Sequence, residues 1–230
     1  MTLDVRRAAD RFTTFTEGRT TRHSFSFDRH YDPDNIGFAL LVAHNDDLVG
    51  PGHGYDDHPH ADTEIVTWVL DGALAHADTD GNAGTVTPGT VQVLSAGSGV
   101  VHAERNAGGE PVRFLQMWLR PSEAGLRPSY ASADVDVTAD WLPLAGRPGS
   151  DAAVAVHADA GLLAARPEVG GVLDLPDAPA VHLYVARGSV DLEGAGPLVA
   201  GDAARMPGGG RRLTATADAE VLAWAMYSLR

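Results

Sequence analysis

Two pairs of residues that can bind metal ions stand out in this chain, and 44 residues separate them. His58 and His60 form the first pair, and His102 and Glu104 form the second. In a β-strand, residues i and i+2 point to the same face, so each pair projects its two side chains together. If the two segments face each other, three imidazoles and one carboxylate converge. That donor set suits a divalent transition metal.

A second carboxylate competes with Glu104 for the fourth ligand position. Glu64 shares the strand parity of His58 and His60, so the spacing alone does not choose between the two glutamates. If Glu104 is the ligand, Glu64 is expected to hold the N–H group of an imidazole from behind. A single His-x-His is commonly a surface accident, but here a matched second cluster accompanies it.

Other polar and aromatic residues are interpreted as structural. Histidines without a partner two residues away are assigned to turns or packing: His23, His30, His44 and His53. His76 is interpreted as a structural or pocket-rim residue, and His157 and His182 as inert. Four aromatic residues are predicted to lie in the core: Phe25, Phe27, Trp68 and Trp118. Four aspartates are predicted to be solvated loop residues: Asp46, Asp47, Asp56 and Asp57.

The composition narrows the class of protein. A chain of 230 residues allows one large β domain or two small ones. Its net charge of −14 disfavours direct binding to nucleic acid. The absence of cysteine rules out disulfides and thiolate metal sites. The sequence contains no uninterrupted run of 18 apolar residues, so no membrane span is predicted. No apolar leader begins the chain, so a cytoplasmic location is expected.

Short apolar segments separated by turn dipeptides predict a β-sandwich or β-barrel. One strand is expected from His58 to Leu70, with Pro59 placing it at a sheet edge or at a bulge. Asn45-Asp46-Asp47 is interpreted as the end of a strand that begins at Gly37. Residues 121–148, with four prolines, are interpreted as a connection between two β-rich halves. Residues 13–22 and 158–166 are left unassigned.

The spacing of these residues resembles the two motifs of cupin barrels. The first motif has the form G, five residues, H-x-H, three or four residues, E, about six residues, G. The matching positions are Gly52, His58, His60, Glu64 and Gly72. The second motif is G, five residues, P-x-G, two residues, H, three residues, N. The residues that match this motif are Gly89, Ser95, Gly99, His102 and Asn106. Two departures are a serine in place of the proline and two extra residues before the histidine.

The second half keeps the frame of these motifs without their ligands. Arg212 stands where the second motif has its histidine, and Leu175, Asp177 and Val181 stand where the first motif has its two histidines and glutamate. The resemblance therefore implies an all-β bicupin, with two jelly-roll barrels in tandem. We expect a metal-binding cupin domain at residues 1–132 and a cupin-like domain without metal ligands at residues 133–230.

More closely, the chain resembles the pirins. The resemblance rests on HSFSFDRHYDP from His23, NDD from Asn45, HPHADTEIVTWVLDGALAHADTDGN from His58 and SAGSGVVHAE from Ser95. Pirins are bicupins with an N-terminal mononuclear iron site. The resemblance implies that His58, His60, His102 and Glu104 are the ligands. Ala61 and Thr63 stand where pirins commonly have larger residues, and we expect this difference to widen the mouth of the pocket.

The resemblance also implies a reaction. Four protein ligands on an octahedral ion leave two positions open, and Fe(II) is the favoured metal, with Ni, Cu, Mn and Zn as alternatives. In the resembling enzymes a flavonol such as quercetin reacts with O2, its heterocycle opens and CO leaves. Glu104 is then the candidate general base that takes the flavonol's hydroxyl proton. The alternative is a redox-sensing regulator that binds a protein partner without turnover.

Overall fold

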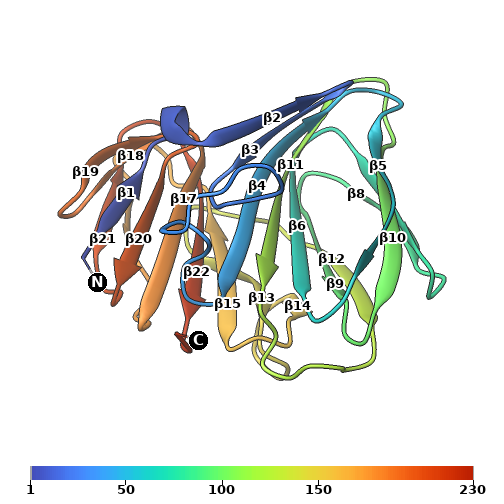
Figure 1. Cartoon of the computed structure of the whole chain (residues 1–230). Helices are drawn as coiled ribbons and strands as arrows, with labels where there is room; N and C mark the ends of the chain where they lie inside the picture. Colours follow the sequence, from blue (N-terminus) through green and yellow to red (C-terminus); the bar gives the residue numbers. More distant parts are fainter. Residues whose placement is uncertain (1, 230) are drawn as a thin grey trace.

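The computed structural model describes residues 2–229, and β-strands make up nearly all of its regular structure (Figure 1). The prediction of an all-β protein is confirmed. Within the described residues the single helical element is the short 3-10 helix η1 (Ala8–Asp10). No helix in that part of the chain is long and apolar enough to cross a membrane.

The first half of the chain forms two sheets. Its strands are β2 (Phe12–Thr16), β3 (Arg19–His23), β4 (Leu41–Val49), β5 (Gly54–His60), β6 (Glu64–Asp71), β7 (Leu74–Asp78), β8 (Ala83–Val86), β9 (Thr90–Ser95), β10 (Val100–Asn106), β11 (Val112–Leu119) and β12 (Ser129–Asp134). A seven-stranded sheet has the order β12-β9-β6-β11-β4-β3-β2. A four-stranded sheet, β5-β10-β7-β8, covers one of its faces.

The second half repeats this arrangement and includes the first strand of the chain. Its strands are β1 (Asp4–Arg6), β13 (Leu142–Gly146), β14 (Val154–Ala155), β15 (Ala160–Ala165), β16 (Val172–Asp174), β17 (Ala180–Arg187), β18 (Ser189–Leu192), β19 (Gly196–Val199), β20 (Ala203–Pro207), β21 (Arg212–Ala215) and β22 (Glu220–Met226). The sheet orders are β1-β20-β17-β22-β15-β13-β14 and β16-β21-β18-β19. The predicted division at residues 132 and 133 stays a prediction.

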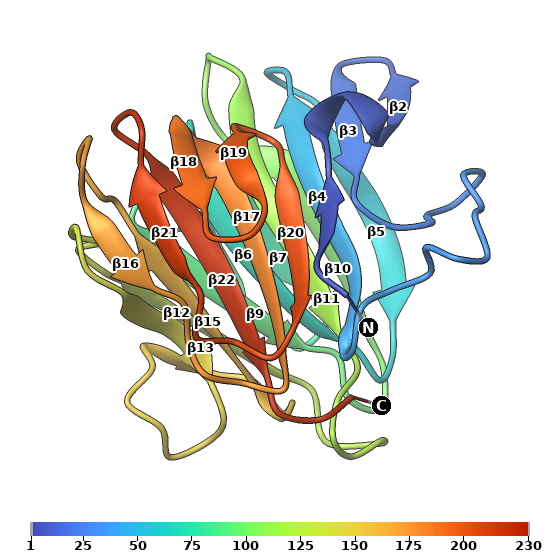
Figure 2. The same cartoon turned by 90° about the vertical axis from the view of Figure 1, so that its left-hand side faces the viewer.

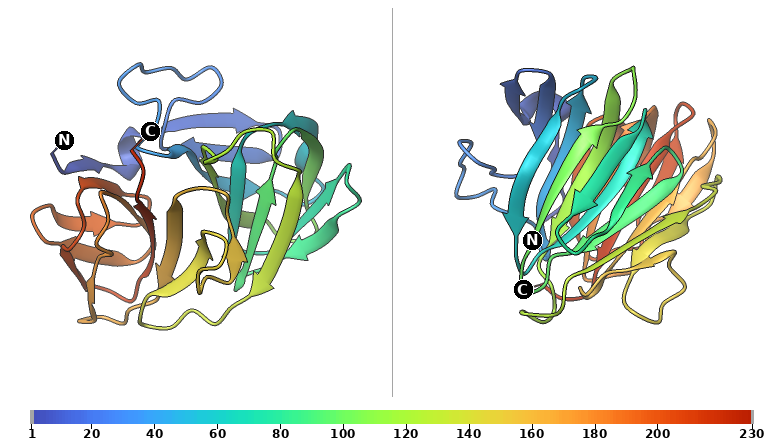
Figure 3. Two further views of the ribbon diagram at one scale, coloured as in Figure 1. Left: turned by 90° about the horizontal axis from the view of Figure 1, so that it is seen from below. Right: turned by 90° about the vertical axis from the view of Figure 1, so that its right-hand side faces the viewer.

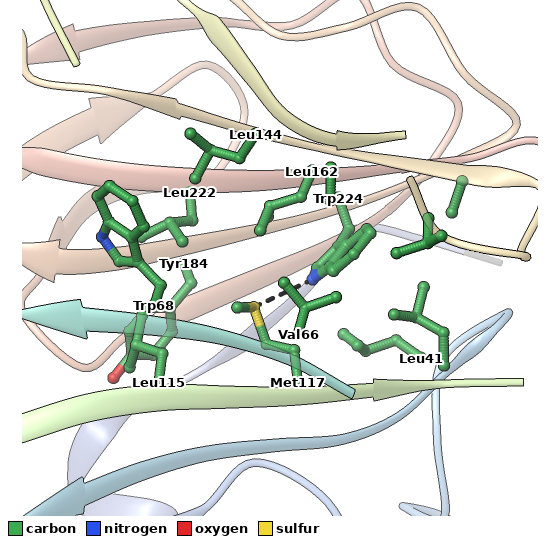
Figure 4. Packing of buried hydrophobic residues seen from close by; sticks show 14 of the residues in the cluster. Leu41, Val66, Trp68, Leu115, Met117, Leu144, Leu162, Tyr184, Leu222 and Trp224 are labelled. Atoms are coloured by element: carbon green, nitrogen blue, oxygen red, sulfur yellow. Dashed lines mark hydrogen bonds between the residues drawn. The ribbon is translucent and has the colours of Figure 1, made fainter. Parts of the chain in front are cut away.

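The two seven-stranded sheets pack face to face, with the four-stranded sheets outside them (Figures 1 and 2). Side chains from both halves interdigitate between them, as Figure 4 shows for Met117 and Trp224. The indole N–H of Trp224 donates to the sulfur of Met117 at 3.2 Å. Trp68 and Trp224 are almost fully buried. Large buried aromatic residues of this kind dominate the hydrophobic stabilisation of a core.

Each half also has an interior of its own, and the two interiors differ chemically. In the second half an apolar cluster lies between the two sheets, and Leu175 and Val181 are buried in it. These two residues occupy positions where the cupin motif has ligands. In the first half polar residues share the interior with a smaller apolar cluster. The space between β5-β10-β7-β8 and the neighbouring sheet, seen from outside in the right panel of Figure 3, is therefore the place to look for chemistry.

Three local expectations were wrong. The strand predicted from His58 to Leu70 is broken at residues 61–63, where Asp62 has a φ of +48°, and the chain passes from one sheet to the other. β4 continues through Asp46 and Asp47 instead of ending before them. Residues 121–148 contain β12 and β13 in addition to connecting segments. The unassigned residues 13–22 include the hairpin β2–β3, and residues 158–166 include β15.

Candidate metal centre

His58 and His60 lie on β5, the edge strand of the four-stranded sheet, as Pro59 between them predicts. β5 pairs with β10, and His58 is directly opposite His102. The pairing then shifts, because Glu104 is opposite Tyr55 and one extra residue of β5 bulges between Tyr55 and His58. A bulge offsets the two-residue alternation of side chains along a strand. The side chains of Tyr55 and His58, three residues apart, therefore line the same cavity.

The structure brings three histidines together. The ring centres of His58 and His102 are 4.4 Å apart. The ring centre of His60 is 4.9 Å from that of His58 and 5.1 Å from that of His102. One ligand-type atom from each of the three lies within 4.8 Å of the other two. Glu104 belongs to a second group, with His102 and His76, that meets the same distance. His102 is thus the side chain that links the two groups.

Several lone pairs in this cluster lack a donor. Within residues 2–229, Nε2 of His60, both ring nitrogens of His102 and Oε1 of Glu104 are buried without a hydrogen-bond partner. The Nδ1–H of His58 can donate to the Asp56 carbonyl oxygen at 2.7 Å, which leaves the Nε2 lone pair of His58 free. Buried acceptors of this kind are costly unless something satisfies them, and a cation does so. The cluster therefore fits a metal ion.

The protonation states of the histidines favour a cation too. Burial lowers the pKa of His60 to about 4, with a further contribution from His58. Burial lowers the pKa of His102 to about 3, and the neighbouring His58, His60 and His76 add to this effect. Histidines with such pKa values are neutral at pH 7 and keep a lone pair for a metal. Burial raises the pKa of Glu104 to about 7 against the opposing hydrogen bond from Gln116.

Glu104 is held by a short chain of hydrogen bonds from β11. Nε2 of Gln116 donates to Oε2 of Glu104 at 2.7 Å. Nε1 of Trp118 donates to Oε1 of Gln116 at 3.1 Å. Both bonds restrict how the carboxylate can turn. Sequence reasoning missed Gln116, although it is a lone uncharged polar residue in the apolar segment 112–119.

His76 lies inside the barrel, not on a pocket rim. It is almost fully buried, and its ring is 5.3 Å from that of His102. Its Nε2 contacts Oδ2 of Asp78 at 3.2 Å, and its ring stacks on Tyr130. Its Nδ1 is buried with no partner in the described part of the chain. These contacts give it a structural role behind His102, which agrees with that part of the prediction.

Glu64 does not support an imidazole, so that expectation was wrong. Its carboxylate accepts a hydrogen bond of 2.6 Å from the hydroxyl of Ser95 and one of 3.0 Å from the backbone N–H of His157. The break at residues 61–63 places Glu64 at the start of β6, in the other sheet from His58 and His60. Glu64 therefore joins the two halves of the molecule instead of facing the cluster.

A cavity of about 270 Å³ opens beside the histidines. Its lining residues are Thr14, Thr16, Arg19, Thr21, His23, Phe27, Asp28, Asn45, Tyr55, His58, Gln116 and Trp118. Phe27 and Trp118 were predicted to be core residues and His23 a packing residue, but all three lie in the cavity wall. Phe25 and Trp68 do belong to the core. Ala61 and Thr63 are not among these lining residues, and the expectation that they widen the mouth of the pocket stays a prediction.

Asp46 and Asp47 are buried, at 2% exposure each, and the prediction of solvated loop residues was wrong for both. Arg113 binds Asp46 through two hydrogen bonds, of 3.0 and 2.7 Å, so burial of that charge is compensated. Asp47 accepts hydrogen bonds from Thr21 and Tyr55. Asp56 and Asp57 are exposed, as predicted, but they lie in β5 and not in a loop. A larger cleft of about 640 Å³ lies near His157, away from the histidine cluster.

Comparison with known proteins places the chain in a family. The family model described as Pirin matches residues 4–119. A protein of Mycobacterium tuberculosis strain H37Rv is 47% identical over 99% of this chain and 96% of its own length. The chain belongs to the pirin family. That mycobacterial protein carries the provisional name quercetin 2,3-dioxygenase. An Escherichia coli K12 protein with the name quercetin 2,3-dioxygenase is 34% identical over 75% of this chain and 76% of its own length.

A solved pirin structure has the same fold. The bacterial pirin YhhW of Escherichia coli, in complex with nickel(II), superposes with a TM-score of 0.92 and 28% identity. The match covers 98% of this chain and 99% of YhhW. The predicted bicupin fold is therefore confirmed, and the two halves described above, each built from a seven-stranded and a four-stranded sheet, are its two barrels.

Proposed function

We propose that this pirin binds one divalent metal ion through His58, His60, His102 and Glu104, with Fe(II) as the favoured metal. The convergence of buried, unpartnered imidazole nitrogens and one carboxylate oxygen within the described chain supports this set most directly. Imidazole and carboxylate ligands also suit Ni, Cu, Mn and Zn. The nickel(II) complex of YhhW is consistent with such breadth.

The proposed reaction is the oxidative opening of a flavonol such as quercetin by O2, with release of CO. The names of the related proteins and the residues that line the cavity support it. Phe27 and Trp118 offer apolar faces for a flat aromatic molecule, and Thr14 and Asn45 offer polar groups for its hydroxyls. When bound, the metal supplies a Lewis acid and a path for electrons between flavonol and O2.

In this proposal the side chains position the reactants. Trp118 and Gln116 fix the orientation of Glu104 by hydrogen bonds, and β5 and β10 hold the histidines in register. Glu104 has a second proposed role, as the general base for the flavonol's hydroxyl group. A Glu104→Gln variant that bound metal and kept full turnover would exclude that role.

The test is quercetin consumption with detection of CO, in air, on protein reconstituted with Fe(II). Metal-dependent loss of quercetin with release of CO supports the dioxygenase. His60→Ala is expected to abolish it, while His157→Ala should retain it, because the backbone N–H of His157 is what binds Glu64. Full occupancy by iron without turnover would instead favour a redox-sensing regulator that binds a protein partner.

A further inference from the structure

His76 is a buried side chain of the first barrel that the proposed ligand set does not use. It lies on β7 directly opposite Glu104 of β10, and Asp78 lies directly opposite His102 in the same strand pair. Residues i and i+2 of a strand share a face, so all four side chains project into the barrel. His76 is almost fully buried and is not among the residues that line the substrate cavity. It therefore stands behind the proposed ligands.

The turn after β7 holds Asp78 in place. Oδ1 of Asp78 accepts the backbone N–H groups of Asp80 and Asn82, at 3.0 Å each, and the side-chain amide of Asn82 at 3.1 Å. The same amide donates to Oδ2 at 2.9 Å. Burial opposes ionisation, but the hydrogen bonds from Asn82 and His76 lower the pKa of Asp78. The carboxylate is therefore both oriented and charged at pH 7.

Asp78 decides which nitrogen of the His76 ring carries the proton. Oδ2 of Asp78 lies 3.2 Å from Nε2 of His76, and both side chains are fully buried. An ionised carboxylate only accepts hydrogen bonds, so the proton must be on Nε2. Burial lowers the pKa of His76 against the opposing effect of Asp78, so the ring is neutral at pH 7. Nδ1 of His76 then carries a lone pair.

A stacking contact fixes the plane of the His76 ring. The ring of Tyr130 on β12 lies 4.7 Å from it at an angle of 21°, and the Tyr130 hydroxyl donates to Gln92 on β9 at 3.1 Å. Gly84 on β8 pairs with His76, and a Cβ atom at position 84 would come within 2.9 Å of the Tyr130 hydroxyl. The missing side chain at Gly84 therefore leaves room for this stack.

His76 and His102 have complementary needs. In residues 2–229, Nδ1 of His76 and both ring nitrogens of His102 are buried without a hydrogen-bond partner. If one His102 nitrogen binds the metal, the other is an N–H group that needs an acceptor. The ring centres are 5.3 Å apart, which is close to the separation of two imidazoles joined by one N–H···N hydrogen bond. Rotation about the broad χ2 torsion can align the two nitrogens.

We propose that His76 accepts the N–H hydrogen bond of His102 in the metal-bound protein, and that Asp78 and His76 together position His102 and strengthen it as a ligand. The inference rests on the proposed function, because it takes His102 as a ligand. Glu104 keeps both roles that the proposed function gives it. Ligating histidines commonly donate their other N–H group to an acceptor, which fixes the tautomer and raises the basicity of the ligand. Here a neutral imidazole is that acceptor, and Asp78 acts through it.

The support of His102 differs from that of His58. Nδ1 of His58 donates to the neutral backbone carbonyl of Asp56 at 2.7 Å. The chain behind His102 ends instead in a buried negative charge, Asp78. A more basic imidazole favours the more highly charged metal ion, so the Asp78–His76 pair stabilises Fe(III) relative to Fe(II). We therefore expect this pair to lower the midpoint potential of bound iron.

The first experiment observes the tautomer of His76 directly. The protein is labelled with 15N-histidine, loaded with diamagnetic Zn(II), and studied by NMR. We expect His76 to have a protonated Nε2 and an unprotonated Nδ1 that accepts a hydrogen bond. One nitrogen of each proposed ligand should shift on loading: His58, His60 and His102. A protonated Nδ1 of His76 in the loaded protein would overturn the inference.

The second experiment removes the acceptor. In His76→Leu, the affinity for Fe(II), measured by competition with a chelator, should fall about 10- to 100-fold. The midpoint potential of bound iron should rise by about 59 mV or more, which corresponds to a tenfold loss of preference for Fe(III). His76→Gln offers a carbonyl oxygen to His102 and an amide N–H to Asp78, so it should recover most of the affinity. A purely structural role predicts no shift of the potential.

Asp78→Asn tests the charge with little change of shape. An amide at this position can donate as well as accept, so the proton of His76 is no longer confined to Nε2. The potential should move in the same direction as in His76→Leu, by a smaller amount. Asp80→Asn is the matched control, because it removes the same charge from an exposed residue of the same turn. It should keep the affinity and the potential of the wild type.

The outcomes separate this inference from the proposed function. Signals of His58, His60 and His102 that do not respond to Zn(II) would overturn the proposed ligand set and this inference with it. Signals that respond, together with wild-type affinity and potential in His76→Leu, would overturn the role of His76 alone. If His76→Leu does not fold, an unchanged potential in Asp78→Asn is the overturning result.

Discussion

Gln116 on β11 donates a hydrogen bond of 2.7 Å to Glu104 on β10, and this contact joins the two sheets of the first barrel across its interior. The amide of Gln116 is itself oriented, because its oxygen accepts the indole N–H of Trp118 at 3.1 Å. Of the two Glu104 oxygens, Oε1 is left facing the cluster with no partner in the described chain. The position of the carboxylate thus depends on a neutral residue of the opposite sheet.

Replacing Gln116 by leucine should weaken metal binding about 10- to 100-fold, the range for loss of a residue that supports a ligand. The affinity for Fe(II) or Ni(II) is measured by competition with a chelator. Gln92→Leu is the matched control, since Gln92 is a buried glutamine on β9 that accepts a hydrogen bond from Tyr130. Equal losses in both variants would contradict the support role of Gln116.

Replacing His60 by alanine should reduce metal affinity by more than tenfold, because it removes one of three neutral imidazoles from the cluster. His157→Ala removes an imidazole that lies near the larger cleft and should bind metal like the wild type. Metal content after dialysis and chelator competition are the measurements. Wild-type affinity in His60→Ala would remove this residue from the ligand set.

Asp47→Asn should stabilise the metal-free protein at alkaline pH. The pKa of Asp47 is raised from 3.8 to about 6 on folding, so its favourable contribution is present below pH 4 and is lost as the pH rises through about 6. At about 1.4 kcal/mol per pKa unit, the variant should exceed the wild type in free energy of unfolding by up to about 3 kcal/mol at pH 8.

Urea unfolding at pH 4 and pH 8 measures this difference, which should nearly vanish at pH 4. Asp57→Asn changes an exposed aspartate of the first barrel and should show no such pH dependence. A stability gap for Asp47→Asn that is the same at both pH values would mean that the carboxylate does not titrate as its burial implies.

Trp68→Phe should destabilise the contact between the two barrels. The Trp68 indole donates to buried Glu220 at 2.7 Å, and loss of that donor costs about 1–3 kcal/mol in addition to lost packing. Trp141→Phe removes a similar bond, of 2.8 Å to the Asp174 carbonyl, at a more exposed position. Free energies of unfolding should fall less for Trp141→Phe, and equal losses would argue against a special role of the buried pair.

The shared face of the two residues within each ligand pair could be predicted because it depends on short-range geometry, whereas the approach of His102 to His58 depends on the pairing of β5 with β10. His58 and His60 share a strand face, as do His102 and Glu104, and this parity is readable from spacing alone. The bulge between Tyr55 and His58 is not readable in this way, and it is what brings Tyr55 into the same wall. The fourth ligand therefore stays a prediction that the metal-binding experiments address.

Asp46 and Asp47 show why other parts of the site were missed. Asparagine and aspartate disfavour strands and favour turns, so NDD was interpreted as the end of a strand. The fold overrides this local preference, because Arg113, Thr21 and Tyr55 from other strands satisfy the two carboxylates. Sequence alone does not reveal such partners when they lie between 8 and 67 residues away.

Glu64 was misjudged for a different reason. Its predicted side of the strand assumed an unbroken strand from His58, and the left-handed backbone of Asp62 breaks it. The partner of Glu64, the backbone of His157, is 93 residues away. The chain passes from one sheet to the other within residues 61–63, and this passage depends on the tertiary structure. The alternation of side chains before the break therefore does not predict the side to which Glu64 points.

The pairing of β1 with β20 bears on how the chain is made. Asp4–Arg6 align with Ala203–Arg205, which follow them in the chain by nearly 200 residues. β1 must therefore stay without its partner strand while these residues are synthesised, and the second barrel cannot close before β20 has been made. We expect β1 to be accessible to proteases and chaperones until β20 is in place.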